Sequence, residues 1–408
     1  MSAPAGIESH AAPRRRRRGA MRDAVVVGGG MVGAATALAL ARAGLAVTLI
    51  EAREPAPWHA DDEIDLRVVA LAPSSAALLH ELGVWSTVRA ARAQPYRHMH
   101  VWDAASAAVL DFDAAAEGRD ALGWIVENRL LQHTLWQALE AAGVQRRCPV
   151  GVSGFEQADG HVRLALDNGE GLDARLLVAA DGGASPLREQ AGIATHGRDY
   201  AQRAVVAHVE TAQAHANTAW QRFAPGGVIA FLPLCDGRSS VVWSLPEAEA
   251  RRVLALDEAA FADAVGVAGD FRLGRVTGVS RRAAFPLKLQ LAKAYQAERM
   301  VLVGDAAHVV HPLAGQGVNL GLRDVAELRD TLRAASLAGR DIGSATVLRR
   351  YARRRHSADT LDAYAFDALA RVFDWRAPPL VGLRSTGLRA LERLPPLRRA
   401  LSAHAGGR

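Results

Sequence analysis

The chain contains very little cysteine. Only Cys148 and Cys235 occur among its 408 residues, and they lie far apart in the sequence. So low a number excludes a disulfide-stapled scaffold, and the spacing excludes a C-x-x-C redox or zinc motif. We therefore expect a protein of a reducing compartment, the cytoplasm.

The chain also lacks a long uninterrupted apolar run. Residues 24–50 are mostly apolar, but Gly28-Gly29-Gly30 and Arg42 interrupt them, and their pattern changes from strand to helix to strand. This predicts no membrane-spanning helix. No separate apolar segment follows the basic N-terminus, which excludes a secretory signal.

The body of the chain lacks a net positive charge. The net charge is +6, but residues 1–20 hold five Arg and one acidic residue, and residues 345–408 hold thirteen Arg and five acidic residues. The segment 21–344 is therefore net negative. A protein that binds nucleic acid carries its positive charge as a patch on the folded body, so we expect no nucleic-acid partner. We interpret Arg14–Arg18 as a solvated tail or an over-called start before Met21, in preference to a nucleic-acid or membrane arm.

Residues 24–50 instead predict a β-α-β unit. The Val-rich run at 24–27 is typical of a buried parallel strand, and an Ala- and Leu-rich helix is predicted at 31–43, with Gly44 as its stop signal. A second strand follows at 45–50. Two further buried strands are predicted at 176–180 and 300–303, and alternating segments between 200 and 290 favour an antiparallel sheet.

The loop between the first strand and its helix fits G-x-G-x-x-G, with glycines at 28, 30 and 33. Gly28 permits the tight turn, Gly30 lets the backbone approach a pyrophosphate, and Gly33 lets the helix pack close to the sheet. The helix N-terminus offers N–H groups to phosphates. Glu51 ends the second strand, where a carboxylate can accept hydrogen bonds from ribose hydroxyls. This motif alone does not separate NAD from FAD.

Two later strand ends carry further candidate residues. Asp181-Gly182 follows one strand, and Ser185 before Pro186 fits a helix N-cap. Gly304-Asp305 ends the other, where an aspartate can bind a sugar-like polyol. Gly315 and Gly317 then open a long helix, whose N–H groups can face a ring carbonyl and stabilise negative charge on a reduced flavin.

His308 and His311 raise the question of a metal site, because both lie beside Asp305. Their i, i+3 spacing has no third soft ligand nearby, and Asp305 is already assigned to a polyol. We therefore predict no metal.

Together these stretches resemble the signature motifs of the class A flavoprotein monooxygenases, the group that includes p-hydroxybenzoate hydroxylase. More narrowly, "HPLAGQGVNLGLRD" and "DLRVVAL" followed by "LGVW" resemble the ubiquinone-biosynthesis hydroxylases of the UbiH/UbiF/VisC family. The likeness runs from about residue 22 to about residue 395 and includes "VENRLLQHTLWQAL", "FLPL" and "LRRYARRR". The arginine run at the N-terminus is not part of the family pattern.

The resemblance implies a non-covalent FAD site. It assigns to the ADP half Gly28, Gly30, Gly33 and Glu51, and to the surroundings of the flavin Arg67 and Asn128. Asp181 belongs to the Asp-Gly motif associated with FAD and NAD(P)H, and Gly304 and Asp305 are assigned to the ribityl chain. The residues assigned to the isoalloxazine are Pro312, Gly315, Gln316, Gly317, Val318 and Asn319. It identifies no side-chain acid or base.

The implied fold is α/β. It comprises a Rossmann-like FAD-binding domain at 21–70, 120–195 and 295–340, a mainly antiparallel substrate domain at 71–119 and 196–294, and a C-terminal helical region at 341–408. The implied reaction is hydroxylation of a polyprenyl phenol or quinol in ubiquinone biosynthesis. In it NAD(P)H reduces FAD, and O₂ forms a flavin C4a-hydroperoxide.

The ring position and the substrate stay open at this point. The stretches "DIG…LRRYARRR" and "WSL" favour hydroxylation at C5, with C6 and C1 as possible positions within the same pathway. Two further functions fit the same motifs: a monooxygenase of another aromatic compound, and a non-catalytic flavoprotein that scaffolds a biosynthetic complex.

The C-terminal region predicts a basic amphipathic helix. Apolar residues recur at helical spacing from Val347 to Val372, and arginines cluster beside them. Such a helix can lie on anionic lipid at the inner face of a membrane or contact the partner proteins of a biosynthetic complex. Equally, it can pack on the FAD domain with its arginines in solvent. The arginines are Arg349, Arg350, Arg353, Arg354 and Arg355, followed by Arg398 and Arg399.

Overall fold

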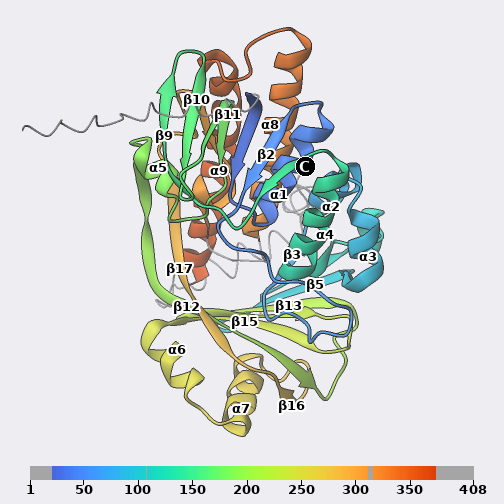
Figure 1. Cartoon of the computed structure of the whole chain (residues 1–408). Helices are drawn as coiled ribbons and strands as arrows, with labels where there is room; N and C mark the ends of the chain where they lie inside the picture. Colours follow the sequence, from blue (N-terminus) through green and yellow to red (C-terminus); the bar gives the residue numbers. More distant parts are fainter. Residues whose placement is uncertain (1–20, 107, 311–315, 374–408) are drawn as a thin grey trace, which may run out of the picture.

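A computed structural model describes residues 21–106, 108–310 and 316–373 (Figure 1). Its first sheet is built around five parallel strands, and the central four have apolar segments that are buried, whereas the fifth, at the edge, is polar. The parallel strands, in spatial order, are β19 (Met300–Leu302), β11 (Gly171–Ala179), β1 (Arg22–Val27), β2 (Val47–Ile50) and β8 (Gln145–Arg147). Antiparallel strands complete the sheet: β18 (Gln296–Ala297) beside β19, and β10 (His161–Leu166) with β9 (Val152–Ala158) beside β11.

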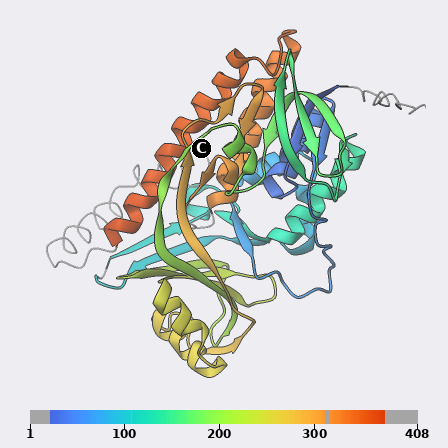
Figure 2. The same cartoon turned by 60° about the vertical axis from the view of Figure 1, so that its left-hand side comes forward.

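Helices cover this sheet and share one hydrophobic core with it. The long helix α8 buries Leu322, Val325, Leu328 and Leu332, as its 3.6-residue periodicity predicts. Figure 2 shows α9 along its length, as the long orange-red helix. The helices are α1 (Met31–Arg42), α2 (Pro73–Glu81), α3 (Trp85–Arg92), α4 (Asn128–Ala141), α5 (Pro186–Gln190), α8 (Gln316–Leu337) and α9 (Ala345–Phe373).

The second sheet is mainly antiparallel and lies below the first in Figure 1. The helices α6 (Glu247–Leu254) and α7 (Glu258–Ala268) cover its lower face. In spatial order its strands are β20 (His308–Val309), β17 (Ala283–Ala292), β12 (Thr195–Thr211), β15 (Ser239–Pro246), β14 (Gly227–Pro233), β13 (Thr218–Ala224), β5 (His98–Asp103) and β6 (Val109–Asp113), and β16 (Val276–Val279) also pairs with β12.

Alternation along these strands gives the second sheet two different faces. Val205, Phe231 and Val241 pack toward α6 and α7, so their neighbours in sequence point to the opposite face, toward the first sheet. A small third sheet joins the two parts, and two 3₁₀ turns complete the described elements. They are β3 (Val68–Leu71), β7 (Gly123–Glu127) and β4 (Gln94–Tyr96), with η1 (Ala115–Glu117) and η2 (Gly304–Ala306).

The predicted fold class, α/β with an antiparallel sheet and a C-terminal helix, is confirmed. The domain limits stay a prediction. The packing favours moving residues 73–92 from the substrate domain to the FAD domain, because Leu79, Trp85 and Val88 of α2 and α3 belong to the core that contains β1 and α1. The strands β5 and β6 instead extend the antiparallel sheet.

Candidate functional site

The glycine loop joins β1 to α1 at the carboxyl end of the parallel sheet. Gly28 has φ +107°, and a Cβ there would lie 2.2 Å from the Ala180 carbonyl oxygen. A Cβ on Gly33 would lie 1.9 Å from the Gly28 carbonyl oxygen. Both glycines are therefore required by the fold itself, because any side chain would collide with backbone.

Gly30 differs from its two neighbours in the motif. Its φ of −66° and ψ of −179° are open to any residue, and a Cβ there would have no atom within 4 Å. Neither the backbone conformation nor side-chain packing therefore requires a glycine at position 30. The position lines a cavity at the N-terminus of α1, where a side chain would occupy the space in front of the helix's free N–H groups. The residue thus fits a loop that must admit a phosphate group.

The cavity has a volume of about 550 Å³ and lies between the glycine loop and the second sheet. It brings together residues predicted from four separate segments. These are Gly30, Gly33, Arg67, Asn128, Asp305, Gly317 and Val318. Convergence of distant segments on one hollow is what a cofactor site requires.

Two polar side chains in the cavity have no protein partner to explain them. The Asn128 side-chain oxygen is buried without a hydrogen-bond partner in the described part of the chain. Asp305 is accessible from the cavity, and no donor from residues 21–106, 108–310 or 316–373 reaches its carboxylate. A buried unsatisfied group such as the Asn128 oxygen is costly unless a ligand pairs with it, whereas the Asp305 carboxylate is exposed to the cavity and open to a ligand. Both therefore fit a bound group that is rich in hydroxyls and amides, as FAD is.

Charge around Asp305 is balanced by two cations. Burial raises the pKa of the Asp305 carboxyl, and the positive charges of His308 and Arg67 oppose that shift. The Arg67 guanidinium also stacks over the Phe285 ring, 5.3 Å from its centroid, which places it between the first sheet and β17. A polyol that donates hydrogen bonds to Asp305 would favour the charged carboxylate further.

Other predicted residues hold the walls of the site. Glu51 accepts hydrogen bonds from the Gly29 amide at 2.5 Å and the Arg53 amide at 2.9 Å, so its carboxylate shapes the glycine loop. Asp181 accepts from the Ser185 hydroxyl at 2.6 Å, near the start of α5. Burial raises the pKa of Asp181, and this bond opposes the shift. It remains a prediction that Glu51 contacts a ribose and that Asp181 contacts a nucleotide.

Asn319 is fully buried, and its amide is used by the protein. The side-chain oxygen accepts from the Ala72 amide at 2.9 Å and the Ser75 hydroxyl at 2.7 Å, and the side-chain nitrogen donates to the Ala70 carbonyl at 2.8 Å. Asn319 thus fastens α8 to β3 and α2, and a cofactor contact would have to use its backbone. Pro312, Gly315 and the side chain of Gln316 lie outside the described residues.

Sequence reasoning missed two donors on α4. Gln132 and Trp136 both donate to the Gly29 carbonyl, at 2.8 and 2.7 Å, and Gln132 also lines the cavity. Their i, i+4 spacing within "VENRLLQHTLWQAL" places them on one helix face and was the available signal. Together with Glu51 they bind both backbone polar groups of Gly29, its N–H and its carbonyl, which holds the loop open for a ligand.

The fold of this chain is shared by solved flavoprotein structures. Comparison with solved structures finds p-nitrophenol 4-monooxygenase PnpA from Pseudomonas putida DLL-E4, with a TM-score of 0.76 and 21% identity over 95% of this chain and 99% of that one. It also finds Klebsiella pneumoniae HpxO complexed with FAD and uric acid, with a TM-score of 0.71 and 20% identity over 92% of this chain and 95% of that one. At these identities the likeness establishes the fold.

The family follows from the sequence comparisons. The family model described as "FAD binding domain" matches residues 21–361. The chain is 42% identical to the 3-demethoxyubiquinol 3-hydroxylase of Escherichia coli (strain K12), over 94% of this chain and 98% of that protein. It is 37% identical to the mitochondrial ubiquinone biosynthesis monooxygenase COQ6 of Homo sapiens, over 94% and 92% respectively. The chain belongs to the ubiquinone-biosynthesis hydroxylase family of class A flavoprotein monooxygenases, as its motifs predict.

Proposed function

We propose that this chain hydroxylates the ring of a polyprenyl phenol or quinol in ubiquinone biosynthesis, with NAD(P)H and O₂ as co-substrates. The observation that carries the proposal is the shared cavity, because one wall is the predicted FAD site and the other is the apolar face of the second sheet. That wall is lined by small and aliphatic side chains, which leave room for a prenylated ring. They include Ala204, Val206, Val228, Ala230, Leu232 and Val242.

The chain's own residues supply binding, orientation and exclusion of water. Gly30, Asn128 and Asp305 would hold FAD, which when bound supplies the redox chemistry that activates O₂. The N-terminal end of α8 begins at the cavity with Gly317 and Val318, so its dipole favours negative charge there. The apolar sheet wall keeps water from the reacting ring.

Polar groups are few on the sheet wall. Gln221, Ser240 and Ser244 line the cavity, and the Ser240 hydroxyl is buried without a partner in the described residues. Ser244 and Val228 lie opposite each other across β14 and β15, as do Ser240 and Leu232. These groups can orient the ring oxygens of a phenol by hydrogen bonds, while the surrounding aliphatic side chains contact its apolar part.

Lipid analysis of a deletion strain tests the proposed substrate. A strain without the gene is expected to accumulate a polyprenyl ring that lacks one oxygen substituent, and mass spectrometry with NMR fixes the ring carbon. The sequence favours C5, whereas the Escherichia coli relative is named a 3-hydroxylase, so the experiment decides between positions. Accumulation of an unprenylated aromatic would favour another substrate. Normal ubiquinone synthesis with a variant that cannot bind FAD would favour a scaffold.

Narrowing the sheet wall should separate substrate binding from cofactor binding. Ala230→Phe adds a ring to the cavity face of β14, and we expect at least a ten-fold loss of activity on a prenylated phenol. FAD occupancy, measured by absorbance, should stay near that of the wild type. A matched change on the other face of the same strand, Ile229→Val, should alter core packing and leave substrate KM unchanged. Wild-type KM in Ala230→Phe would contradict the assignment of this wall.

Membrane contact through α9 stays a proposal, with one correction. Arg355 is only 8% exposed and forms buried ion pairs, so its predicted place in an exposed basic patch is wrong. Val347 and Tyr351 are also buried, which shows that the first half of α9 packs on the protein. Beyond it, Leu361 and Tyr364 are 66% and 49% exposed. Within the described ranges, no helix has the length and apolarity to cross a bilayer.

Vesicle flotation tests this contact with the arginines that remain exposed. Wild-type protein is expected to float with anionic vesicles at low salt, and the triple variant Arg349→Gln, Arg350→Gln, Arg353→Gln should float much less. Each exposed cation contributes roughly 1 kcal/mol near an anionic surface. High salt should abolish the difference. If wild type does not float at low salt, direct lipid contact is wrong and delivery by a partner protein is favoured.

A further inference from the structure

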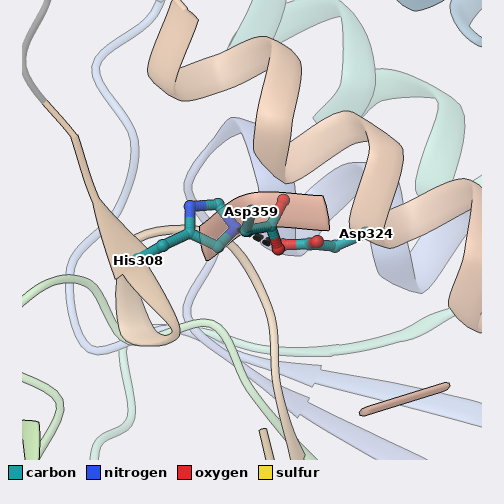
Figure 3. A group of neighbouring side chains, drawn as sticks. All are labelled: His308, Asp324 and Asp359. Carbon is teal, nitrogen blue, oxygen red and sulfur yellow. Dashed lines mark hydrogen bonds and ion pairs between the residues drawn. The ribbon is translucent and has the colours of Figure 1, made fainter. Parts of the chain in front are cut away.

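A cluster of charged side chains lies behind the cofactor cavity and is not part of its lining. His308 of β20, Asp324 of α8 and Asp359 of α9 meet with no exposed side-chain surface (Figure 3). The His308 Nε2 lies 2.7 Å from an Asp324 oxygen and 3.6 Å from an Asp359 oxygen. Arg355 pairs with both carboxylates and donates to Asp324 at 2.7 Å. The packing of β20, α8 and α9, which are distant in sequence, therefore depends on this one set of buried ion pairs.

The arrangement does not fit a metal site, although one nitrogen and two carboxylate oxygens lie within 4.8 Å of one another. The Arg355 guanidinium already pairs with both carboxylates, and a divalent cation would face its positive charge directly. Burial alone would lower the pKa of the His308 imidazole, but the carboxylates of Asp324 and Asp359 raise it to about 9. The two carboxylates therefore favour the protonated ring, and a protonated imidazole is a poor metal ligand.

The cluster contacts the turn that presents Asp305. The Asp324 oxygen that binds His308 also accepts from the Gly304 amide at 2.9 Å. Gly304 has φ +60°, and a Cβ there would lie 3.0 Å from the Val32 side chain, so the turn has little freedom. From α9, the Tyr351 hydroxyl donates to the Leu302 carbonyl at 2.8 Å. Helix α9 thus contacts the end of β19 directly through Tyr351, and it reaches the Gly304 turn indirectly, through the pairing of Arg355 with Asp324.

We propose that this cluster couples the docking of α9 to FAD binding, with His308 as the positioning residue that sets the Gly304–Asp305 turn. The inference rests on FAD binding and is independent of the substrate proposed above. Coupling is reciprocal, so FAD must tighten the docking of α9 to the same extent that docked α9 tightens FAD. FAD affinity therefore depends on whether α9 is docked.

Cofactor affinity of the apo-protein gives the first test. His308→Gln removes the buried cation, and we expect at least ten-fold weaker FAD binding in a fluorescence titration. The matched control is Arg354→Gln, which breaks the Arg354–Glu327 pair between the same two helices on the surface, at 2.8 Å. It should bind FAD within two-fold of wild type. Wild-type affinity in folded His308→Gln, or an equal loss in the control, would overturn the proposal.

A pH series with Asp359→Asn covers the case in which His308→Gln does not fold. Burial and the Asp324 charge raise the pKa of Asp359 to about 7, against the attraction of His308 and Arg355. The other groups that face it are Asp362 and the buried hydroxyls of Tyr295 and Tyr351. At pH 6 the wild-type carboxyl is protonated and resembles Asn, so both proteins should bind FAD alike. At pH 8.5 it is ionised, and the variant should bind several-fold more weakly. Wild-type FAD affinity of Asp359→Asn at every pH contradicts the coupling.

Hydrogen exchange measures the reciprocal effect directly. In wild type and Arg354→Gln, saturating FAD should slow exchange of the amides of residues 345–365. In His308→Gln at saturating FAD that slowing should be lost, even though the site is filled. If FAD leaves the exchange of α9 unchanged in wild type, α9 and the cofactor are not coupled.

Discussion

Gly30→Val is expected to abolish FAD binding while leaving the protein folded. The backbone at Gly30 lies in an extended conformation that valine adopts readily, and a Cβ at this position would have no atom within 4 Å. Loss of a glycine N-cap for valine costs about 1 kcal/mol, a shift of about one degree in Tm for a protein of this size. A branched side chain in front of the α1 N-terminus keeps phosphates from its N–H groups, so we expect affinity to fall by roughly 100-fold or more.

Gly33→Val provides the contrast, because a Cβ at Gly33 would lie 1.9 Å from the Gly28 carbonyl oxygen. That variant should lose the fold as well as the cofactor. Gly30→Ala, with a smaller side chain, should fall between wild type and Gly30→Val in affinity. Circular dichroism, thermal unfolding and flavin absorbance distinguish these outcomes. Stoichiometric FAD in purified Gly30→Val would mean that this loop does not face the phosphates.

The sequence predicts those parts of the site that depend on local backbone chemistry. A Val-rich strand, a glycine turn and an apolar helix face each leave a periodic or compositional signal, and β1, α1 and α8 form where those signals place them. The motif also indicates which glycines matter. It also predicts a tight turn at Gly28 and close helix packing at Gly33, and a Cβ at either position would collide with backbone, whereas a Cβ at Gly30 would face open space.

Residues whose role depends on distant partners could not be predicted in this way. Arg355 belongs to a run of three arginines and has the sequence pattern of a solvated face. Arg355 is buried because it forms ion pairs with Asp359, one turn later on the same helix, and with Asp324 on another helix. A local stretch of sequence contains Asp359 but not Asp324. Asn319 likewise sits within a cofactor motif, whereas its amide fastens α8 to β3 and α2.

Asp305→Ala is expected to weaken FAD binding and stabilise the apo-protein at the same time. The carboxylate lines the cavity without a donor from the described residues, and burial raises its pKa above the ordinary value of 3.8. Its charge therefore opposes folding of the empty protein, and removing it should raise the free energy of unfolding only slightly, because Asp305 is exposed in the empty cavity and water screens its charge. Bound FAD would lose a charge-assisted hydrogen bond, so affinity should fall by roughly 10- to 100-fold.

The pH dependence of apo-protein stability tests whether the Asp305 charge destabilises the empty protein. Because the folded-state pKa of Asp305 is raised, the folded protein binds more protons than the unfolded chain just above pH 3.8. The Asp305 contribution therefore lowers wild-type stability as pH rises from 3.8 through the folded-state pKa, and Asp305→Ala and Asp305→Asn should both lack it. Asn keeps the shape and one acceptor oxygen, so it should retain more FAD affinity than Ala. Chemical denaturation across this pH range, alongside FAD titration, measures both effects. A less stable apo-protein in both variants, or full FAD occupancy in Asp305→Ala, would place the carboxylate in the structural framework and outside the cofactor site.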